Sequence, residues 1–268
     1  KGKKFYDKQY WKYALNLALP LVPHYLSQIL LNQMDRIMIS SICGNDKAGI
    51  YSVAYSAAMV MVIVGKAIQT SFSPWIYKSI EENKTENIKG TVNVLCIIMA
   101  TANFLVICFA PEVIRILGGE NYIEAIYVVP PLVASSFLIF IYSMFCTIEF
   151  YYEVTKPMMI VSIAGALLNF ITNFVFIKLF GYYAAGYTTL FSYVFFVAVH
   201  YCVMKNALKR QGMRKKIYDE KFMILFTVLF VIGSVLMGLT YNTLLIRYFI
   251  LLVLFFVVVV YLFHLFFP

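Results

Sequence analysis

Charged residues are scarce in this sequence, and their scarcity excludes a water-soluble globular domain. Of the 268 residues, 13% are charged and 62% are hydrophobic, whereas an ordinary globular domain carries roughly 25% charged residues. A chain with so few polar side chains cannot cover its own surface in water. The five cysteines are an odd number scattered through apolar segments. They do not form a disulfide framework and are most simply explained as small buried residues.

The motifs of soluble enzymes are also missing. The sequence has no GxSxG, Walker loop, HExxH, CxxC or helix-opening GxGxxG. Its three histidines stand in three separate apolar segments, which favours helix packing over metal binding: His24, His200 and His264. Glu149 and Glu153 are four residues apart and could share a helix face near Lys156, a pattern that indicates a structural charge network rather than catalysis. We therefore expect no enzymatic activity, no catalytic residue and no firm metal site.

Long apolar runs are what the sequence has instead. Runs of about 20 or more apolar residues are typical of transmembrane helices. They predict an all-α, polytopic membrane protein with eight transmembrane helices. These are residues 14–42, 48–77, 91–117, 122–151, 157–179, 182–204, 222–241 and 244–267. Pro20 and Pro23 predict a kink in the first helix.

The lengths of the connections divide the chain into four parts. We expect an interfacial segment at 1–13, a six-helix lobe at 14–207, a basic loop at 208–221 and an appended pair of helices at 222–268. The first residues, KGKKFYDKQYWKY, are basic and aromatic and contain no initiator Met. They are typical of a linker inside a longer protein, so we expect the chain to be a fragment whose other half is missing.

Basic residues are distributed very unevenly among the connections. Sixteen Lys and Arg lie on the side of the N-terminus, in 1–13, 78–90, 152–156 and 205–221, against only Lys47 in the opposite loops. This asymmetry predicts that both termini are cytoplasmic. The basic run in 205–221 is expected to contact anionic lipids rather than nucleic acid.

A few ionisable side chains fall inside the apolar runs, where a charge costs at least about 2.5 to 3.5 kcal/mol and normally faces a bundle interior or a wet cavity. On the first two helices, residues at a spacing of three or four form polar stripes that predict a cavity wall. The residues expected to line a substrate cavity are Lys66, Arg36, Asn32, Gln69 and Tyr55. Arg36 and Lys66 would offer positive charge to an anionic group such as a phosphate. Alternatively, Asp35 and Arg36 pair with other helices and hold the bundle together.

A second polar set lies on the fifth and sixth predicted helices. Asn169 and Asn173 are one helical turn apart and share a face, while Thr188 and Thr189 follow on the next helix. Amides, hydroxyls and carbonyls are the oxygen ligands that a small cation needs. They are equally suited to hydrogen bonds between helices, and spacing alone does not choose between the two interpretations.

Three separated motifs resemble one known family. The run PLVPH, LNQMDRIMIS and GNDKAGIYSVAY (Pro20 to Tyr55) resembles the seventh helix and following turn of bacterial polysaccharide-biosynthesis flippases. These are the O-antigen and capsule type of the multidrug/oligosaccharidyl-lipid/polysaccharide exporter superfamily. The run LNFITNFVFIKLFGYYAAGYTT (Leu168 to Thr189) and the run EVTKP (Glu153 to Pro157) are similar to later segments of that family.

The resemblance implies the second, C-terminal half of a two-lobed transporter in the bacterial cytoplasmic membrane. Such flippases carry a lipid-diphosphate-linked oligosaccharide across the membrane by alternating access, through a cationic cavity. In a related peptidoglycan-precursor flippase, sodium sits between the seventh, eleventh and twelfth helices. The matching positions here are Asp35, Asn169, Asn173 and Thr189, with Asn173 standing where that relative has an acid. The resemblance thus implies no cofactor, a lipid-linked glycan as substrate, and Na⁺ or H⁺ as the coupling ion.

Three alternatives stay open. A drug/cation antiporter of the same fold would be expected to carry acids in its pocket, whereas Lys66 places a positive charge at mid-span. A membrane-embedded glycosyl- or acyltransferase would need acids or histidines clustered near an interface, where only Glu149 and Glu153 come close. A membrane scaffold without transport activity would leave Lys66 without a role.

Overall fold

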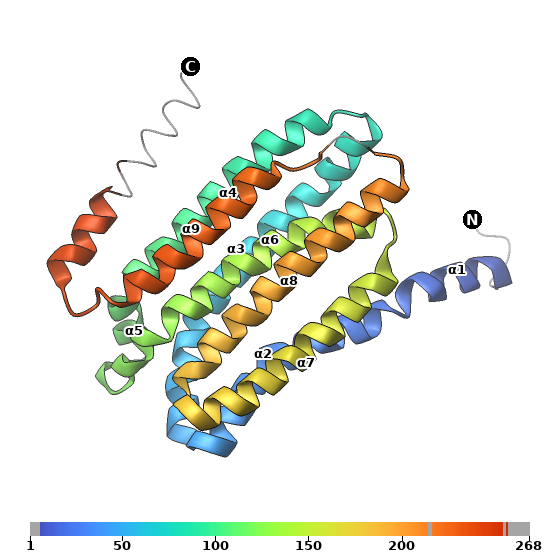
Figure 1. The fold of residues 1–268 in the computed structure, drawn as a ribbon. Helices are drawn as coiled ribbons and strands as arrows, with labels where there is room; N and C mark the ends of the chain where they lie inside the picture. Colours follow the sequence, from blue (N-terminus) through green and yellow to red (C-terminus); the bar gives the residue numbers. More distant parts are fainter. Residues whose placement is uncertain (1–5, 214–215, 254–255, 257–268) are drawn as a thin grey trace.

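The computed structural model describes residues 6–213, 216–253 and 256, and over these residues the chain is a bundle of α-helices without β-strands (Figure 1). The elements are α1 (Lys8–Ala18), α2 (Leu21–Cys43), α3 (Asn45–Glu81), α4 (Thr85–Cys108), α5 (Ala110–Gly118), the 3-10 helix η1 (Glu120–Tyr127), α6 (Val129–Tyr151), α7 (Thr155–Phe180), α8 (Tyr183–Arg210) and α9 (Glu220–Gly238). A shorter apolar helix, Leu244–Val253, follows.

The predicted fold class is confirmed. In the described part of the chain, seven helical segments are long and apolar enough to cross a membrane, with α1 and α2 counting as one segment. They correspond to the first seven predicted spans. The eighth prediction, 244–267, begins with the apolar helix Leu244–Val253, and most of its remainder lies outside the described residues.

The predicted third and fourth spans are longer than the helices that the structure shows. The third was expected over 91–117, but α4 ends at Cys108 because Pro111 lacks an N–H and its ring excludes the carbonyl of the residue four positions earlier. The predicted fourth span, 122–151, is likewise interrupted before Pro130. The chain between these two points forms α5 and η1, a structured connection at one end of the bundle.

The first span is bent where the sequence predicts it. α1 ends at Ala18 and α2 begins at Leu21, so the break falls at Pro20, just ahead of Pro23. Helix α1 starts earlier than the predicted residue 14, because the carboxylate of Asp7 accepts hydrogen bonds from the first-turn backbone and caps the helix.

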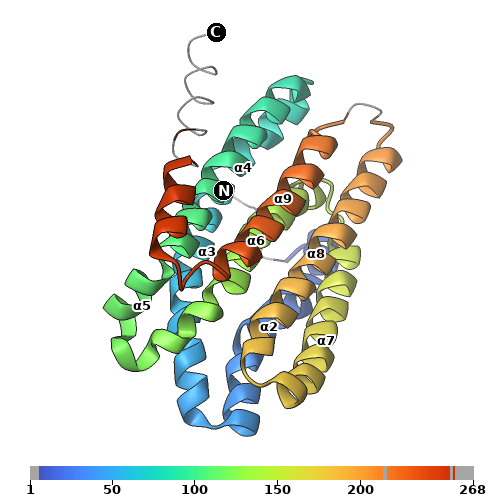
Figure 2. The same cartoon turned by 60° about the vertical axis from the view of Figure 1, so that its left-hand side comes forward.

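Helix α6 is at the centre of the bundle and is buried over most of its length. Figures 1 and 2 show it with α4 and α9 on one side and α2 and α7 on the other. Successive contacts of α2 with α7, α7 with α8, α8 with α6, α6 with α3, and α3 with α2 close a ring of five helices. The buried polar side chains of these helices lie in the interior of this ring, which we call the lobe interior.

The last described helix is attached to the lobe by an ion pair. Arg247 has 2% of its surface exposed, and its Nη1 lies 3.1 Å from Oε2 of Glu112 on α5, with Nη2 2.5 Å from Oε1. This bidentate geometry is the strong form of the Arg–carboxylate pair. It fixes the Leu244–Val253 helix beside the α5 end of the bundle.

Candidate functional site

The carboxylate of Asp35 is the centre of a polar cluster in the lobe interior. Asp35 lies on α2 and has 1% of its surface exposed. It accepts hydrogen bonds from Tyr51 on α3 (2.6 Å), Asn173 on α7 (2.6 Å) and Thr189 on α8 (2.7 Å). A carboxylate removed from water is stable only when its oxygens are hydrogen-bonded or paired with a cation. Here three neutral donors from three helices surround it.

Further amides and hydroxyls extend this cluster, which we call the Asp35 cluster. The Asn173 amide donates to Oδ1 of Asn169 at 3.0 Å, and the Asn169 amide donates to Oγ1 of Thr189 at 3.4 Å. The hydroxyl of Thr188 donates to Oδ1 of Asn173. The structure thus brings together all four residues matched to a sodium site, Asp35, Asn169, Asn173 and Thr189. Spacing places both asparagines on one face of α7, and Gly181, with φ at +76°, ends α7 and turns the chain into α8.

Two members of the Asp35 cluster were not among the predicted ion ligands. Tyr51 follows the first turn of α3, and its aromatic ring makes it resemble a core residue in the sequence. Thr188 was part of the polar set but was not matched to a ligand. The sequence signal that could have identified Tyr51 is its spacing of four residues from Tyr55, which places both on one face of α3. Their rings stack, with centroids 6.4 Å apart.

Three of the predicted cavity residues lie together beside the Asp35 cluster. Tyr55 donates to Oδ1 of Asn32 at 3.2 Å, and the guanidinium of Arg36 lies over the Tyr55 ring, 4.7 Å from its centroid. Arg36 also donates to Oε1 of Gln33 at 2.6 Å. Within the described residues Arg36 makes no ion pair with Asp35. Asp35 bonds to three other helices, in each case through a neutral donor. Arg36 contacts α3 through the ring of Tyr55.

The other two predicted cavity residues lie elsewhere on α3. Lys66 is exposed on the surface of the lobe, in an open depression of about 550 Å³ with Val62, Ile63, Ala67, Thr70 and Ser71. Gln69 is buried against α6, where its amide donates to Thr147 at 3.1 Å and to Ser73 at 3.2 Å. The five residues expected to line one cavity therefore occupy three places, because Lys66 and Gln69 follow Tyr55 by 11 and 14 residues and so lie about 17 and 21 Å further along α3.

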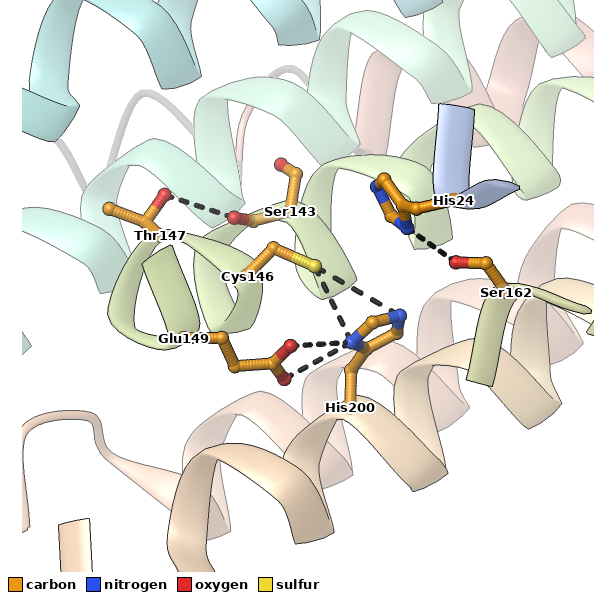
Figure 3. A network of polar contacts seen from close by, with 7 residues as sticks. All are labelled: His24, Ser143, Cys146, Thr147, Glu149, Ser162 and His200. Atoms are coloured by element: carbon orange, nitrogen blue, oxygen red, sulfur yellow. Dashed lines mark hydrogen bonds and ion pairs between the residues drawn. The ribbon is translucent and has the colours of Figure 1, made fainter. Parts of the chain in front are cut away.

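A second polar cluster, absent from the sequence predictions, lies between α6 and α8 (Figure 3). Nδ1 of His200 is 3.0 and 3.1 Å from the two carboxylate oxygens of Glu149 and 3.4 Å from Sγ of Cys146. Beside it, Nδ1 of His24 is 2.5 Å from the hydroxyl of Ser162. His200 is thus a buried residue at the contact of α8 with α6, and its partners Glu149 and Cys146 were not predicted. His264 lies outside the described residues.

The prediction that Glu149 and Glu153 share a helix face is wrong. Helix α6 ends at Tyr151, and Glu153 adopts a positive φ of 56° in the turn that follows. Its carboxylate accepts a hydrogen bond from Tyr13 on α1 at the end of the bundle, whereas that of Glu149 points toward His200 on α8. The helix ends before the four-residue spacing could place both acids on one face.

The fold defines a polytopic α-helical membrane protein whose lobe interior contains two buried polar clusters. The MatE family model matches residues 20–175, more than half of the chain, so the chain belongs to the MatE family. Members of this family are transporters and not enzymes, which confirms the expectation of a non-enzymatic protein.

Two known proteins are similar to this chain. It is 31% identical over 86 residues to a protein of the Lsg locus of Haemophilus influenzae, a match that covers 31% of this chain and 21% of that protein. The chain therefore matches about a fifth of the length of this curated relative. A solved structure of a MOP superfamily transporter from Pyrococcus furiosus superimposes with a TM-score of 0.55 at 20% identity, covering 85% of this chain and 52% of that one. This likeness shows that the two share a fold.

Proposed function

We propose that the chain is the C-terminal lobe of a flippase that moves a lipid-diphosphate-linked oligosaccharide across the bacterial cytoplasmic membrane for polysaccharide export. Membership of a transporter family supports transport. The chain matches 52% of the length of the solved MOP superfamily transporter, which is the share expected for one lobe of a protein with two similar lobes. The resemblance of the Pro20–Tyr55 and Leu168–Thr189 segments to polysaccharide flippases supports this substrate class.

The observation that carries the proposal is the position of Lys66. Its ammonium lies in the middle of α3, a span of 37 residues, and is exposed on the lobe without an ion pair among the described residues. A lone ammonium facing lipid at this depth costs at least about 2.5 to 3.5 kcal/mol. Facing a wet cavity between two lobes, it would instead attract an anionic diphosphate. Arg36 adds a second positive charge on the neighbouring helix α2.

The experiment is glycan export by cells that depend on the full-length protein. Lys66→Ala should abolish export while the protein remains in the membrane at normal abundance, and Lys66→Arg should retain part of it because the positive charge remains. Lys178→Ala is a matched control, since Lys178 is also a cation within a span but lies over the ring of Phe174 on α7. Normal export by the Lys66→Ala variant would remove this residue from the mechanism.

A second candidate is a drug/cation antiporter of the same fold. The buried carboxylate of Asp35 favours it, because such a group can bind a proton or sodium ion in exchange for a cationic substrate. The same variants separate the two candidates. Lys66 repels organic cations, so Lys66→Ala would leave cation efflux unchanged or raise it in an antiporter, whereas the flippase loses its transport activity.

We further propose that the Asp35 cluster holds the coupling cation, with Na⁺ the leading candidate and H⁺ the alternative. Carboxylate, amide and hydroxyl oxygens are the hard ligands that a small cation prefers. Hydrogen bonds already link Asp35 to Asn173, Asn173 to Asn169, Asn169 to Thr189 and Thr189 back to Asp35. Rotating the Asn173 amide by a half-turn would point its oxygen, instead of its N–H group, at the position beside Asp35.

A further inference from the structure

Cys146, Glu149 and His200 form a compact group of three metal-ligating side chains, separate from the Asp35 cluster. Their ligand atoms all lie within 4.8 Å of one another. Glu149 and His200 have 0% of their surface exposed, and Cys146 has 5%. Cys146 and Glu149 are one helical turn apart on α6, and His200 faces them from α8 (Figure 3).

The distances from Nδ1 of His200 to the other two residues are close to the spacing of ligand atoms around a tetrahedral zinc ion. Zinc binds nitrogen, oxygen and sulfur at about 2.0 to 2.3 Å, so two ligand atoms of one tetrahedron lie about 3.3 to 3.7 Å apart. The distances from Nδ1 of His200 are 3.0 and 3.1 Å to the carboxylate oxygens and 3.4 Å to the sulfur. Each of these distances is within a few tenths of an ångström of that spacing.

The charges of the group also suit a divalent cation. A carboxylate and a thiolate together carry two negative charges, which a divalent cation neutralises, and a neutral imidazole supplies a lone pair. Beside the pair of Glu149 and His200, the thiol of Cys146 adds a third ligand atom, 3.4 Å from Nδ1 of His200. Sulfur and imidazole ligands select zinc-like ions over Mg²⁺ or Ca²⁺, which prefer oxygen.

Aromatic rings hold the imidazole of His200 in the orientation that faces the other two ligands. The rings of Tyr142 and Phe196 stack on it, with centroids 5.4 and 5.9 Å away and interplanar angles of 22° and 11°. An orientation fixed by packing lowers the cost of assembling a coordination shell.

We propose that Cys146, Glu149 and His200 bind one zinc-class divalent cation that joins α6 to α8. The ion would link the central helix of the lobe to its neighbour, near the end that carries the loop after α8. The proposal does not depend on which substrate the protein transports, because the ligands belong to a cluster distinct from Lys66 and from Asp35.

The test is metal binding by the purified full-length protein, freed of any affinity tag and of bound metal by a chelator. After Zn²⁺ is added back and the excess is dialysed away, we expect elemental analysis to find one Zn²⁺ per chain. We also expect Co²⁺ in its place to give the absorption of a tetrahedral site, together with a thiolate-to-metal charge-transfer band. Cys146→Ser should remove that band and weaken Zn²⁺ binding about 100-fold or more. Cys202→Ser is the matched control, because Cys202 lies two residues from His200 but is exposed on another face of α8.

Several results would overturn the proposal. Wild-type protein that retains no Zn²⁺ and gives no charge-transfer band with Co²⁺ has no such site, and this measurement needs no variant to fold. A band that persists in Cys146→Ser and disappears in Cys202→Ser would place the metal elsewhere. If Glu149→Gln and wild type bind Zn²⁺ equally, the carboxylate is not a ligand and the group is a hydrogen-bonded pair.

Discussion

At the scale of single residues, Asp35 is surrounded by donors that a cation could replace. Its two oxygens accept from Tyr51, Asn173 and Thr189, all neutral groups on other helices. Each such hydrogen bond to a charged acceptor is worth about 1.5 to 3 kcal/mol. Sodium binding would exchange part of this hydrogen bonding for direct contacts with oxygen, so the ion should stabilise the protein only while the carboxylate is present.

We predict that Na⁺ raises the thermal midpoint of purified full-length protein relative to K⁺ at equal ionic strength, and that Asp35→Asn abolishes this difference. The amide keeps the size of the side chain but removes the charge that attracts the ion. Asp46→Asn, which changes an acid in the first turn of α3, should behave like wild type. The measurement is a melting curve in detergent. An equal sodium response in wild type and Asp35→Asn would show that Asp35 is not a ligand.

At the scale of helices, α7 and α8 approach closely because α7 carries Gly165 at their contact. A Cβ atom added at this position would lie 2.4 Å from Cζ and 2.5 Å from Cε2 of Phe196. Phe196 is itself part of the stack on His200 and Tyr142. Small residues at such contacts are how membrane helices gain van der Waals packing.

We therefore predict that Gly165→Ala destabilises the lobe by about 1 to 3 kcal/mol, the usual cost of overpacking. Gly233→Ala on α9 is the matched control, because an added Cβ there meets its nearest atom, in Phe104, at an ordinary 3.8 Å. Melting in detergent should show a lower midpoint for Gly165→Ala alone. Equal midpoints for both variants would mean that Phe196 moves aside without cost.

Hydropathy was sufficient to predict the helices, but not the interruptions before Pro111 and Pro130. The apolar runs continue through these positions, and the breaks depend on proline geometry rather than on polarity. Helical spacing and family resemblance together anticipated the Asp35 cluster, since Asn169 and Asn173 share a face. By contrast, Glu149 and His200 are 51 residues apart, and spacing within one helix carries no information about which residue faces it from another helix.

At the scale of the whole molecule, the connections at one end of the bundle carry most of the basic residues. The turn after α3, the turn after α6 and the loop after α8 lie at this end, as does α1 (Figure 1). Positive charge in short loops is retained on the cytoplasmic side. We propose that this end faces the cytoplasm and that its basic loop contacts anionic lipids.

We predict that a cysteine at Lys216 is protected from a membrane-impermeant maleimide in intact cells and is labelled after permeabilisation. A cysteine at Asn45, in the opposite turn, should be labelled from outside. Both substitutions are made in a Cys202→Ser background, since Cys202 is the exposed native cysteine among the described residues. Labelling of Lys216→Cys in intact cells would reverse the proposed orientation.

The central claim is that Lys66 recognises the diphosphate of a lipid-linked oligosaccharide as the lipid crosses the membrane. The most direct measurement is the rate at which full-length protein, reconstituted into vesicles, exposes such a lipid on the opposite leaflet. Wild type and Lys178→Ala should flip it at the same rate. Lys66→Ala should be about 10- to 100-fold slower, because a hydrogen bond to a charged group is worth about 1.5 to 3 kcal/mol. A wild-type rate in Lys66→Ala, or no flipping by the wild type, would contradict the account.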